Sequence, residues 1–497
     1  MYKFYYDESE HSRVLNYSTL KSCTYYDNFL VGIIGFDEKN EDKISNSYIE
    51  FENKYELRKR KGELKSLTMK IKDLECGFAS LNKHTIAFYE DLLNFFNENI
   101  IIYIASLSKL EIIIDQVFEK YRNIAFLDFD LMKYSLVKMI NVYHPDNVLN
   151  AIYKDEKEFK KALKDFLIDR IEKNKDNINL KQKESNVCEE ILYVLDEIGE
   201  VKSLDWNYTI AFDGFKKLTN EMNVKDFDFI IDKEGEEKQD SKTLEAARKV
   251  GFENAIEGNS KSYVGLRIAD MLGGVIAKLM KSLRNSLKYN GDYLNKKLLE
   301  YKWFKLNERQ INLYKKLYKI ICENNNYWYK TYAGVYADDF ILFISLLQYI
   351  VKNENLINLE DDKCALESEY FNTYANNALI LHFDRIKNKL QIDFVNDEEE
   401  FVINSRGAKV YKDIRKQPIL EIRDGNNEFD VLAVGMDSLG NPLTTIKKDN
   451  KVVCYRIPDE YSEWALTMIG FSNMGINFFP GKVNFSFQNG KYYVDLL

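Results

Sequence analysis

The chain has 497 residues, 45% of them hydrophobic and 30% charged, so it is long enough for about two or three domains and too apolar to be disordered. Its formal net charge of -9 at pH 7 argues against a protein that coats nucleic acid by bulk electrostatic attraction. The opening MYKFYYDESE lacks the basic and apolar regions of a signal peptide, and the longest apolar stretch, Phe340–Val351, is too short to span a bilayer. Six cysteines without zinc-ligand spacing are typical of reduced core residues, so a cytoplasmic protein without a membrane segment is predicted.

Apolar runs with alternating or continuous patterning predict the strands of an α/β sheet. In chain order these strands cover Tyr2–Asp7, Phe29–Ile34, Ile100–Ala105, Tyr208–Phe212 and Phe227–Ile231. Residues 107–200 are highly charged and are predicted to form a helical insertion, with the polar stretch Lys173–Asn186 as a loop between two helices. The core and its insertion together make a first domain over residues 1–290.

The rest of the chain divides at a change in composition. Residues 291–375 have apolar positions at three-to-four spacing and are predicted to be helical. Four of the five prolines follow residue 400, and strand-like alternation becomes frequent after Ala378, so residues 376–497 are predicted to be a β-rich domain. Its end is predicted to be a hairpin, with Asn489-Gly490 supplying the positive φ angles of a type I′ turn.

Three aspartates occupy positions that suit a metal-dependent nuclease. Asp7 closes the first predicted strand, and Asp232 ends the apolar strand FDFIID. Asp270 lies in the predicted helix GLRIADMLGGVIAKLMK, whose two internal glycines indicate a close approach to a sheet or ligand. Two-metal phosphodiester hydrolysis needs three or four converging carboxylates of this kind to hold Mg²⁺ or Mn²⁺. Asp213 in IAFDGF competes with Asp232 for the third position.

Basic residues accompany a further candidate ligand. Glu63 lies in KGELKSL, two residues before Lys65, and either Lys65 or Arg60 is predicted to stabilise phosphate charge. The predicted contacts to nucleic acid are Arg58, Arg60 and Lys61 before Glu63, and Lys278 and Lys281 on the helix face that follows Asp270. A solvated basic face fits the same helix pattern, and strand-end aspartates often serve only in turns or caps. The order of the four carboxylates along the chain is the more specific signal.

The segments YYDES, GELKSL, FIID and SKSYVGLRIADMLGG resemble the bacterial family called domain of unknown function 3800, which is regarded as ribonuclease H-like. The resemblance covers about residues 1–280. It implies metal ligands at Asp7, Glu63, Asp232 and Asp270, with Lys65 and Ser262 as supporting residues, and a role in phage defence. The chain departs from the family in its long insertion and in Glu10, which stands where the family usually has glycine.

The predicted fold is therefore an α/β, ribonuclease H-like mixed sheet with a helical insertion, followed by a helical segment and a β-rich C-terminal domain. The predicted function is two-metal hydrolysis of nucleic acid with Mg²⁺ or Mn²⁺, with RNA favoured slightly over DNA as the substrate. The main alternative is a non-catalytic scaffold or sensor that binds a protein or nucleic-acid partner through its C-terminal domain. A third interpretation takes Tyr336-Ala337-Asp338-Asp339 as the metal-binding hairpin of a polymerase, although its flanks are predicted to be helical.

Overall fold

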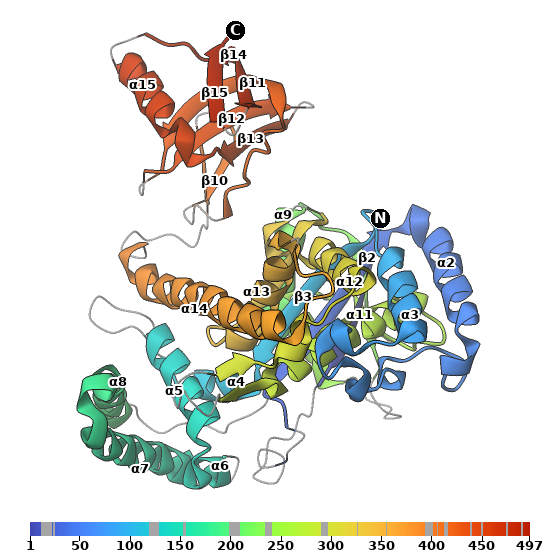
Figure 1. The fold of residues 1–497 in the computed structure, drawn as a ribbon, viewed down its shortest axis with the longest axis vertical. Helices are drawn as coiled ribbons and strands as arrows, with labels where there is room; N and C mark the ends of the chain where they lie inside the picture. The colour runs from blue at the N-terminus through green and yellow to red at the C-terminus, as the bar shows by residue number, and fades with distance from the viewer. Residues whose placement is uncertain are drawn as a thin grey trace. The chain divides into compact units, whose positions relative to one another are not determined.

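A computed structural model describes the chain as two compact units, Met1–Asn388 and Lys389–Leu497 (Figure 1). The described residues are all except 11–21, 23–24, 119–128, 153–155, 198–208, 234–240, 290–296, 326, 354, 393–400, 405, 412–415, 438–439, 449–450, 474–475 and 489–490. Within this described part, no helix combines the length and the apolar character needed to cross a membrane.

A six-stranded mixed sheet organises the first unit. Its strands are β1 (Tyr2–Ser9), β2 (Asn28–Asp37), β3 (Ile101–Ser108), β4 (Phe227–Asp232), β5 (Ala255–Gly258) and β8 (Thr331–Ala333). They lie in the order β5-β4-β1-β2-β3-β8. Strand β2 runs antiparallel to both β1 and β3, whereas β4 and β5 run parallel to β1 and β8 runs parallel to β3. The sequence-based strands at the positions of β1, β2, β3 and β4 are therefore confirmed.

The predicted strand Tyr208–Phe212 is wrong. Its described residues begin the helix α9 (Thr209–Glu221), and Tyr208 lies outside the described residues. Ala211, Phe212 and Phe215 of this helix are buried together against the sheet. A short apolar run has the same appearance in a buried strand and on one face of a helix, and here the helical spacing continues to Leu218.

Helices cover both faces of the sheet. On one face α11 (Val264–Asn285) and α2 (Glu41–Lys54) pack in an apolar cluster that includes Tyr5 and Ile230. On the other face α9 and α10 (Lys242–Val250) pack in a cluster that includes Tyr6 and Ile231. Since successive side chains of a strand point to opposite faces, odd-numbered residues of β1 and even-numbered residues of β4 face α11.

The predicted insertion is helical and has its own apolar core. Its helices are α4 (Lys109–Val117), α5 (Phe129–Tyr143), α6 (Asp146–Ala151), α7 (Glu156–Asn174) and α8 (Ile178–Glu197). The predicted loop Lys173–Asn186 is wrong, because only one 3-10 turn, Lys175–Asn177, separates α7 from α8. The polar residues of that stretch form a helix face, on which Glu184 accepts hydrogen bonds from Arg170 and Lys181.

The segment after α11 is also helical. A small hairpin of β6 (Leu287–Tyr289) and β7 (Lys297–Leu299) precedes α12 (Glu308–Tyr318), α13 (Asp338–Lys352) and α14 (Asp361–Ile392). Helix α14 runs through the predicted domain boundary at residue 376. The polymerase interpretation is wrong in its local structure, because Asp338 and Asp339 begin α13 and do not lie in a strand hairpin.

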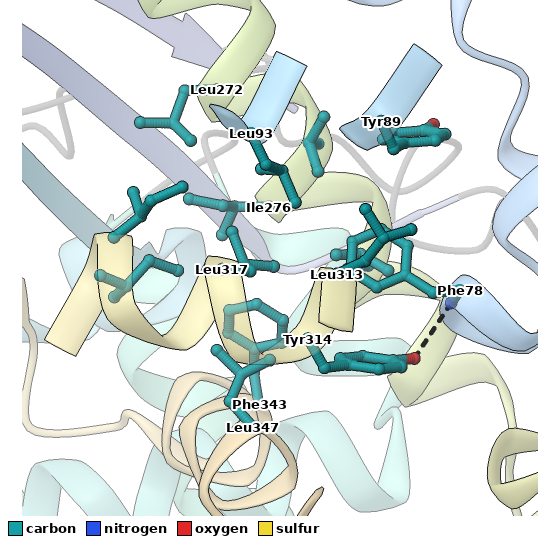
Figure 2. Close-up of a cluster of buried hydrophobic side chains, with 14 of the residues drawn as sticks. Phe78, Tyr89, Leu93, Leu272, Ile276, Leu313, Tyr314, Leu317, Phe343 and Leu347 are labelled. Carbon is teal, nitrogen blue, oxygen red and sulfur yellow. Dashed lines mark hydrogen bonds between the residues drawn. The ribbon is translucent and has the colours of Figure 1, made fainter. Parts of the chain in front are cut away.

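The apolar core beneath α11 contains a buried hydrogen bond that can be tested (Figure 2). Side chains of α3 (Lys83–Phe95), α11, α12 and α13 meet there, and the Tyr314 hydroxyl accepts a hydrogen bond from the backbone N–H of Phe78 at 3.0 Å. We expect Tyr314→Phe to lower the free energy of unfolding by about 1–2 kcal/mol, because it leaves the Phe78 N–H buried without an acceptor. Urea denaturation measures this change.

Tyr89 is the matched control, since it belongs to the same cluster and its hydroxyl has no hydrogen-bond partner among the described residues. We expect Tyr89→Phe to change the free energy of unfolding by less than about 0.5 kcal/mol. Equal losses in both variants would contradict a specific contribution of the hydrogen bond to Phe78.

The second unit contains a five-stranded antiparallel sheet in the order β13-β12-β11-β14-β15. Its elements are β9 (Phe401–Ile403), β10 (Lys409–Tyr411), β11 (Gly425–Met436), β12 (Pro442–Lys448), β13 (Lys451–Arg456), α15 (Ser462–Asn473), β14 (Gly481–Gln488) and β15 (Lys491–Leu496). Tyr461 and Phe485 lie in its apolar core. The predicted terminal hairpin is confirmed by the pairing of β14 with β15, and its turn at Asn489-Gly490 lies outside the described residues.

Candidate active site

Asp7 and Asp232 lie side by side at the ends of neighbouring strands. Strands β1 and β4 are parallel, and their register pairs Tyr6 with Ile231, so the two aspartates follow at the same level. Both belong to the set of side chains that faces α11, and both are partly exposed. The alternation predicted from the sequence therefore places two carboxylates on one face of the sheet.

Helix α11 brings Asp270 to the same place, and its backbone lies close to strand β2. A Cβ atom at Gly32 of β2 would lie 3.4 Å from the Ala269 carbonyl oxygen and 3.7 Å from the Gly273 Cα atom. No side chain separates helix from strand at this point. The close approach that was predicted from the glycine pair in GLRIADMLGG is confirmed.

Ser66 holds the Asp270 carboxylate in place through two hydrogen bonds. Its backbone N–H donates to Asp270 Oδ2 at 2.8 Å, and its hydroxyl donates to Asp270 Oδ1 at 2.5 Å. This contact requires a glycine at position 274, because a Cβ atom there would lie 2.1 Å from the Ser66 Cβ atom. The two adjacent glycines thus differ, because Gly274 leaves no room for a Cβ atom beside Ser66, whereas Gly273 faces the strands with ordinary van der Waals space.

Glu63 enters the site through a tight turn. Lys61 and Gly62 have φ angles of 54° and 91°, and the Arg60 N–H donates to the Glu63 carbonyl oxygen at 2.8 Å. The Glu63 side chain is only 8% exposed. Its Oε1 atom accepts from the Ser260 hydroxyl at 3.2 Å, whereas its Oε2 atom is buried with no hydrogen-bond partner in the described structure. Such an orphaned carboxylate oxygen is costly without a cation or a donor.

Lys65 and Ser260 complete this side of the site. The Lys65 ammonium donates to the Ser260 hydroxyl at 2.9 Å and lies 3.6 Å from Glu63 Oε1. The implied supporting residue Ser262 is exposed, and the hydroxyl that bridges Lys65 to Glu63 belongs to Ser260. Sequence reasoning missed Ser260, for which the only signal is its place in the same SKS segment.

A second carboxylate positions the segment that carries Glu63. Glu52 on α2 accepts from the Leu64 backbone N–H at 3.1 Å, and its other oxygen lies 3.3 Å from Arg267 Nη2 on α11. This buried bridge ties Leu64, and hence its neighbour Glu63, to two helices. No motif in the sequence indicated it.

The carboxylates act on one another electrostatically. Burial raises the pKa of Asp7 well above its ordinary value, and the nearby charges of Asp270 and Asp232 raise it further. Burial likewise raises the pKa of Asp232 to about 6, against the opposing effect of Lys65 and with added repulsion from Asp270 and Glu63. The charges of the four predicted ligands are therefore close enough to influence one another.

Asp213 does not belong to this group. It lies on α9, which packs against the opposite face of the sheet, and it is exposed there. Burial raises the pKa of Asp213, and the charges of Lys217 and Lys216 lower it. Between the two candidates for the third ligand, the structure brings Asp232 to the site.

The predicted nucleic-acid contacts have different surroundings. Arg58 lies over the Phe88 ring, 4.6 Å from its centroid, while Arg60 and Lys61 are exposed on the turn before Glu63. Lys278 is partly buried, and Lys281 donates a hydrogen bond to Glu10 Oε2 at 2.8 Å. The expected basic face after Asp270 is thus not a uniform solvated surface.

The residues fit a divalent cation by their chemistry, although they are not preassembled around one. Among the residues that the structure describes, no three His, Cys, Asp or Glu side chains are close enough to form a ready metal site. Asp270 is engaged by Ser66, and Glu63 Oε1 by Ser260. The unpartnered Glu63 Oε2 atom and the mutual repulsion of the aspartates are nevertheless what a hard cation with oxygen ligands would relieve.

Comparison of the chain with protein-family models, with curated proteins and with solved structures finds no match.

Proposed function

We propose that the first unit is a ribonuclease H-like, metal-dependent nuclease that hydrolyses phosphodiester bonds, with RNA favoured slightly over DNA. The observation that carries the proposal is the convergence of Asp7, Asp232 and Asp270 on one face of the sheet, beside the buried Glu63. Carboxylates from two adjacent strand ends and one helix suit Mg²⁺ or Mn²⁺ in phosphodiester hydrolysis.

The topology supports the fold assignment. Three antiparallel strands, β1, β2 and β3, are followed by β4 and β5 on the other side of β1 and parallel to it. This arrangement is the one expected of a ribonuclease H-like sheet, and the resemblance to domain of unknown function 3800 implies the same fold. A role in phage defence follows only from that resemblance.

Each side chain has a distinct task in the proposed reaction. Asp7, Glu63, Asp232 and Asp270 would hold the cations, which supply water activation and charge neutralisation when they are bound. Ser66 orients Asp270, and Ser260 orients both Lys65 and Glu63. The Lys65 ammonium stabilises the negative charge that develops on the phosphate as water attacks phosphorus and the bond to the leaving oxygen breaks.

Cleavage of labelled single-stranded and duplex RNA and DNA tests the proposal, with Mg²⁺, Mn²⁺ or EDTA in parallel. We expect cation-dependent cutting that falls by more than about 100-fold in Asp7→Asn and Asp270→Asn, because each variant removes a ligand from the carboxylate group. Asp213→Asn is the matched control, since it changes the same residue type on the opposite face of the sheet, and we expect it to retain activity.

Cutting that persists in the Asp7 and Asp270 variants would place the activity elsewhere or in a contaminant. Folded protein that binds nucleic acid but never cuts it, under all cations and on all substrates, would refute the nuclease and favour the binding scaffold.

A further inference from the structure

Lys278 is a cation in an unusual position. It lies on α11 two turns after Asp270, and its side chain is partly buried. The charges of Asp270 and Glu10 act on its ammonium, yet among the described residues no hydrogen bond or ion pair within 4 Å holds it. The Nζ atom of Lys278 is also accessible to solvent. A partly desolvated ammonium without a bonded counter-ion favours an incoming anion.

The neighbouring Lys281 is held by a carboxylate from the end of β1. Its ammonium donates to Glu10 Oε2 at 2.8 Å, with side chains that are 13% and 27% exposed for Lys281 and Glu10. Glu10 has a φ angle of 61°, in the left-handed region that disfavours a residue with a Cβ atom.

We propose that the ammonium groups of Lys278 and Lys281 form a phosphate-binding subsite for the nucleic-acid backbone, and that Glu10 occupies this subsite as an internal competitor. A phosphodiester group carries one negative charge, as Glu10 does, so it replaces Glu10 at Lys281 without changing the local charge. Its additional oxygens reach Lys278, which Glu10 does not bond.

The surroundings support binding of an anion at this point. Lys109 is buried, and its ammonium donates a hydrogen bond to the Tyr26 carbonyl oxygen at 2.8 Å, so Lys109 is not one of the two lysines that contact the phosphate. Its charge nevertheless acts on the region of Glu10 and Lys281 and adds to the positive potential. The charge of Asp270 acts on Lys278, so a phosphate bound here lies within electrostatic reach of a proposed cation ligand. The subsite rests on the proposed function for the identity of its ligand.

Fluorescence anisotropy with a labelled single-stranded RNA in EDTA measures binding without hydrolysis. We expect Glu10→Gln to tighten binding by about 5-fold to 10-fold, because it removes the competing carboxylate. We expect Lys278→Gln to weaken binding by a similar factor and to lower the salt dependence by about one phosphate contact. Glu172→Gln is the control, since it removes the same charge from a surface ion pair with Lys175 on the insertion.

A double-variant cycle separates the subsite from general charge effects. In a Lys281→Gln background, Glu10→Gln should no longer tighten binding, because its carboxylate then has no lysine to block. Thermal melting of each variant verifies that it is folded. Equal effects of Glu10→Gln and Glu172→Gln, or an unchanged effect of Glu10→Gln without Lys281, would overturn the subsite even if the wild-type protein cuts RNA. Tightening that depends on Lys281 supports the subsite even if no cutting is found with any cation.

Discussion

Gly274→Ala is expected to destabilise the first unit by about 3–5 kcal/mol and to abolish cleavage at the candidate site. The added Cβ atom would lie 2.1 Å from the Ser66 Cβ atom, so helix α11 and the Ser66 segment would have to separate. Separation also breaks the two hydrogen bonds from Ser66 to the Asp270 carboxylate, which are charge-assisted. Urea denaturation and the cleavage assay measure the two consequences.

Gly273→Ala is the matched control for this substitution. A Cβ atom there would meet Ser9 Oγ at 3.6 Å and Leu30 Cδ2 at 3.9 Å, which are ordinary van der Waals distances. Alanine is better than glycine inside a helix by about 1 kcal/mol, so Gly273→Ala should be neutral or stabilising. Equal losses in the two variants would mean that the Ser66 contact is not what requires glycine at position 274.

Neutralising Asp232 is expected to stabilise the cation-free protein at neutral pH. Its pKa is about 6 in the folded protein against 3.8 as the ordinary value, a shift that corresponds to at most about 3 kcal/mol. Since its side chain reaches solvent, we expect Asp232→Asn to raise the free energy of unfolding by about 1–2 kcal/mol at pH 7.5. Asp7→Asn should act in the same direction, because the Asp7 pKa is raised as well.

The sign of the pH dependence follows from the raised pKa. Well below pH 3.8 the carboxyl is protonated in both the folded and the unfolded chain, and Asp232→Asn should have little effect on stability. As the pH rises from about 3.8 to about 6, the unfolded chain loses this proton while the folded chain still holds it, so the stability advantage of the variant should grow over this range and level off above about pH 6. Thermal melting from pH 4 to pH 8 in EDTA measures it.

Asp226→Asn is the control for this series, because Asp226 is exposed at the opposite end of β4. A stability gain in that variant, or a gain at Asp232 that does not vary with pH, would contradict repulsion within the carboxylate group. Added Mg²⁺ should raise the melting temperature of the wild type and should do so less in Asp232→Asn, since one ligand is then missing.

The parts of the fold that could be predicted are those with a local signal. Continuous or alternating apolar residues marked β1, β2, β3 and β4, and the terminal hairpin of β14 and β15 carried its own turn dipeptide. Two predicted elements were wrong because the same local residue pattern suits two kinds of secondary structure. The start of α9 has the apolar run of a strand, and the polar residues around Glu184 form the face of α8 through ion pairs with α7.

The same division holds for the candidate site. Asp7 and Asp232 could be predicted as site residues because the apolar periodicity shows where strands end. Asp270 could be predicted because two glycines close to it in a helix are unusual. Ser66 and Ser260 were not visible as partners, since serine is common and its role depends on a neighbour that is distant in the sequence. The pairing of Lys281 with Glu10 was missed for the same reason, because it joins residues 271 positions apart.

The sequence by itself indicated four strands of the first sheet, the carboxylates that end two of them, and a close approach of the backbone of α11 to another element. Only the tertiary structure decided that Asp232, and not Asp213, joins Asp7, because this depends on which face of the sheet each residue occupies. It also decided what holds Asp270, since Ser66 lies 204 positions away along the chain. Local residue preferences act over a few neighbours, whereas the geometry of this site is set by packing between segments that are far apart in sequence.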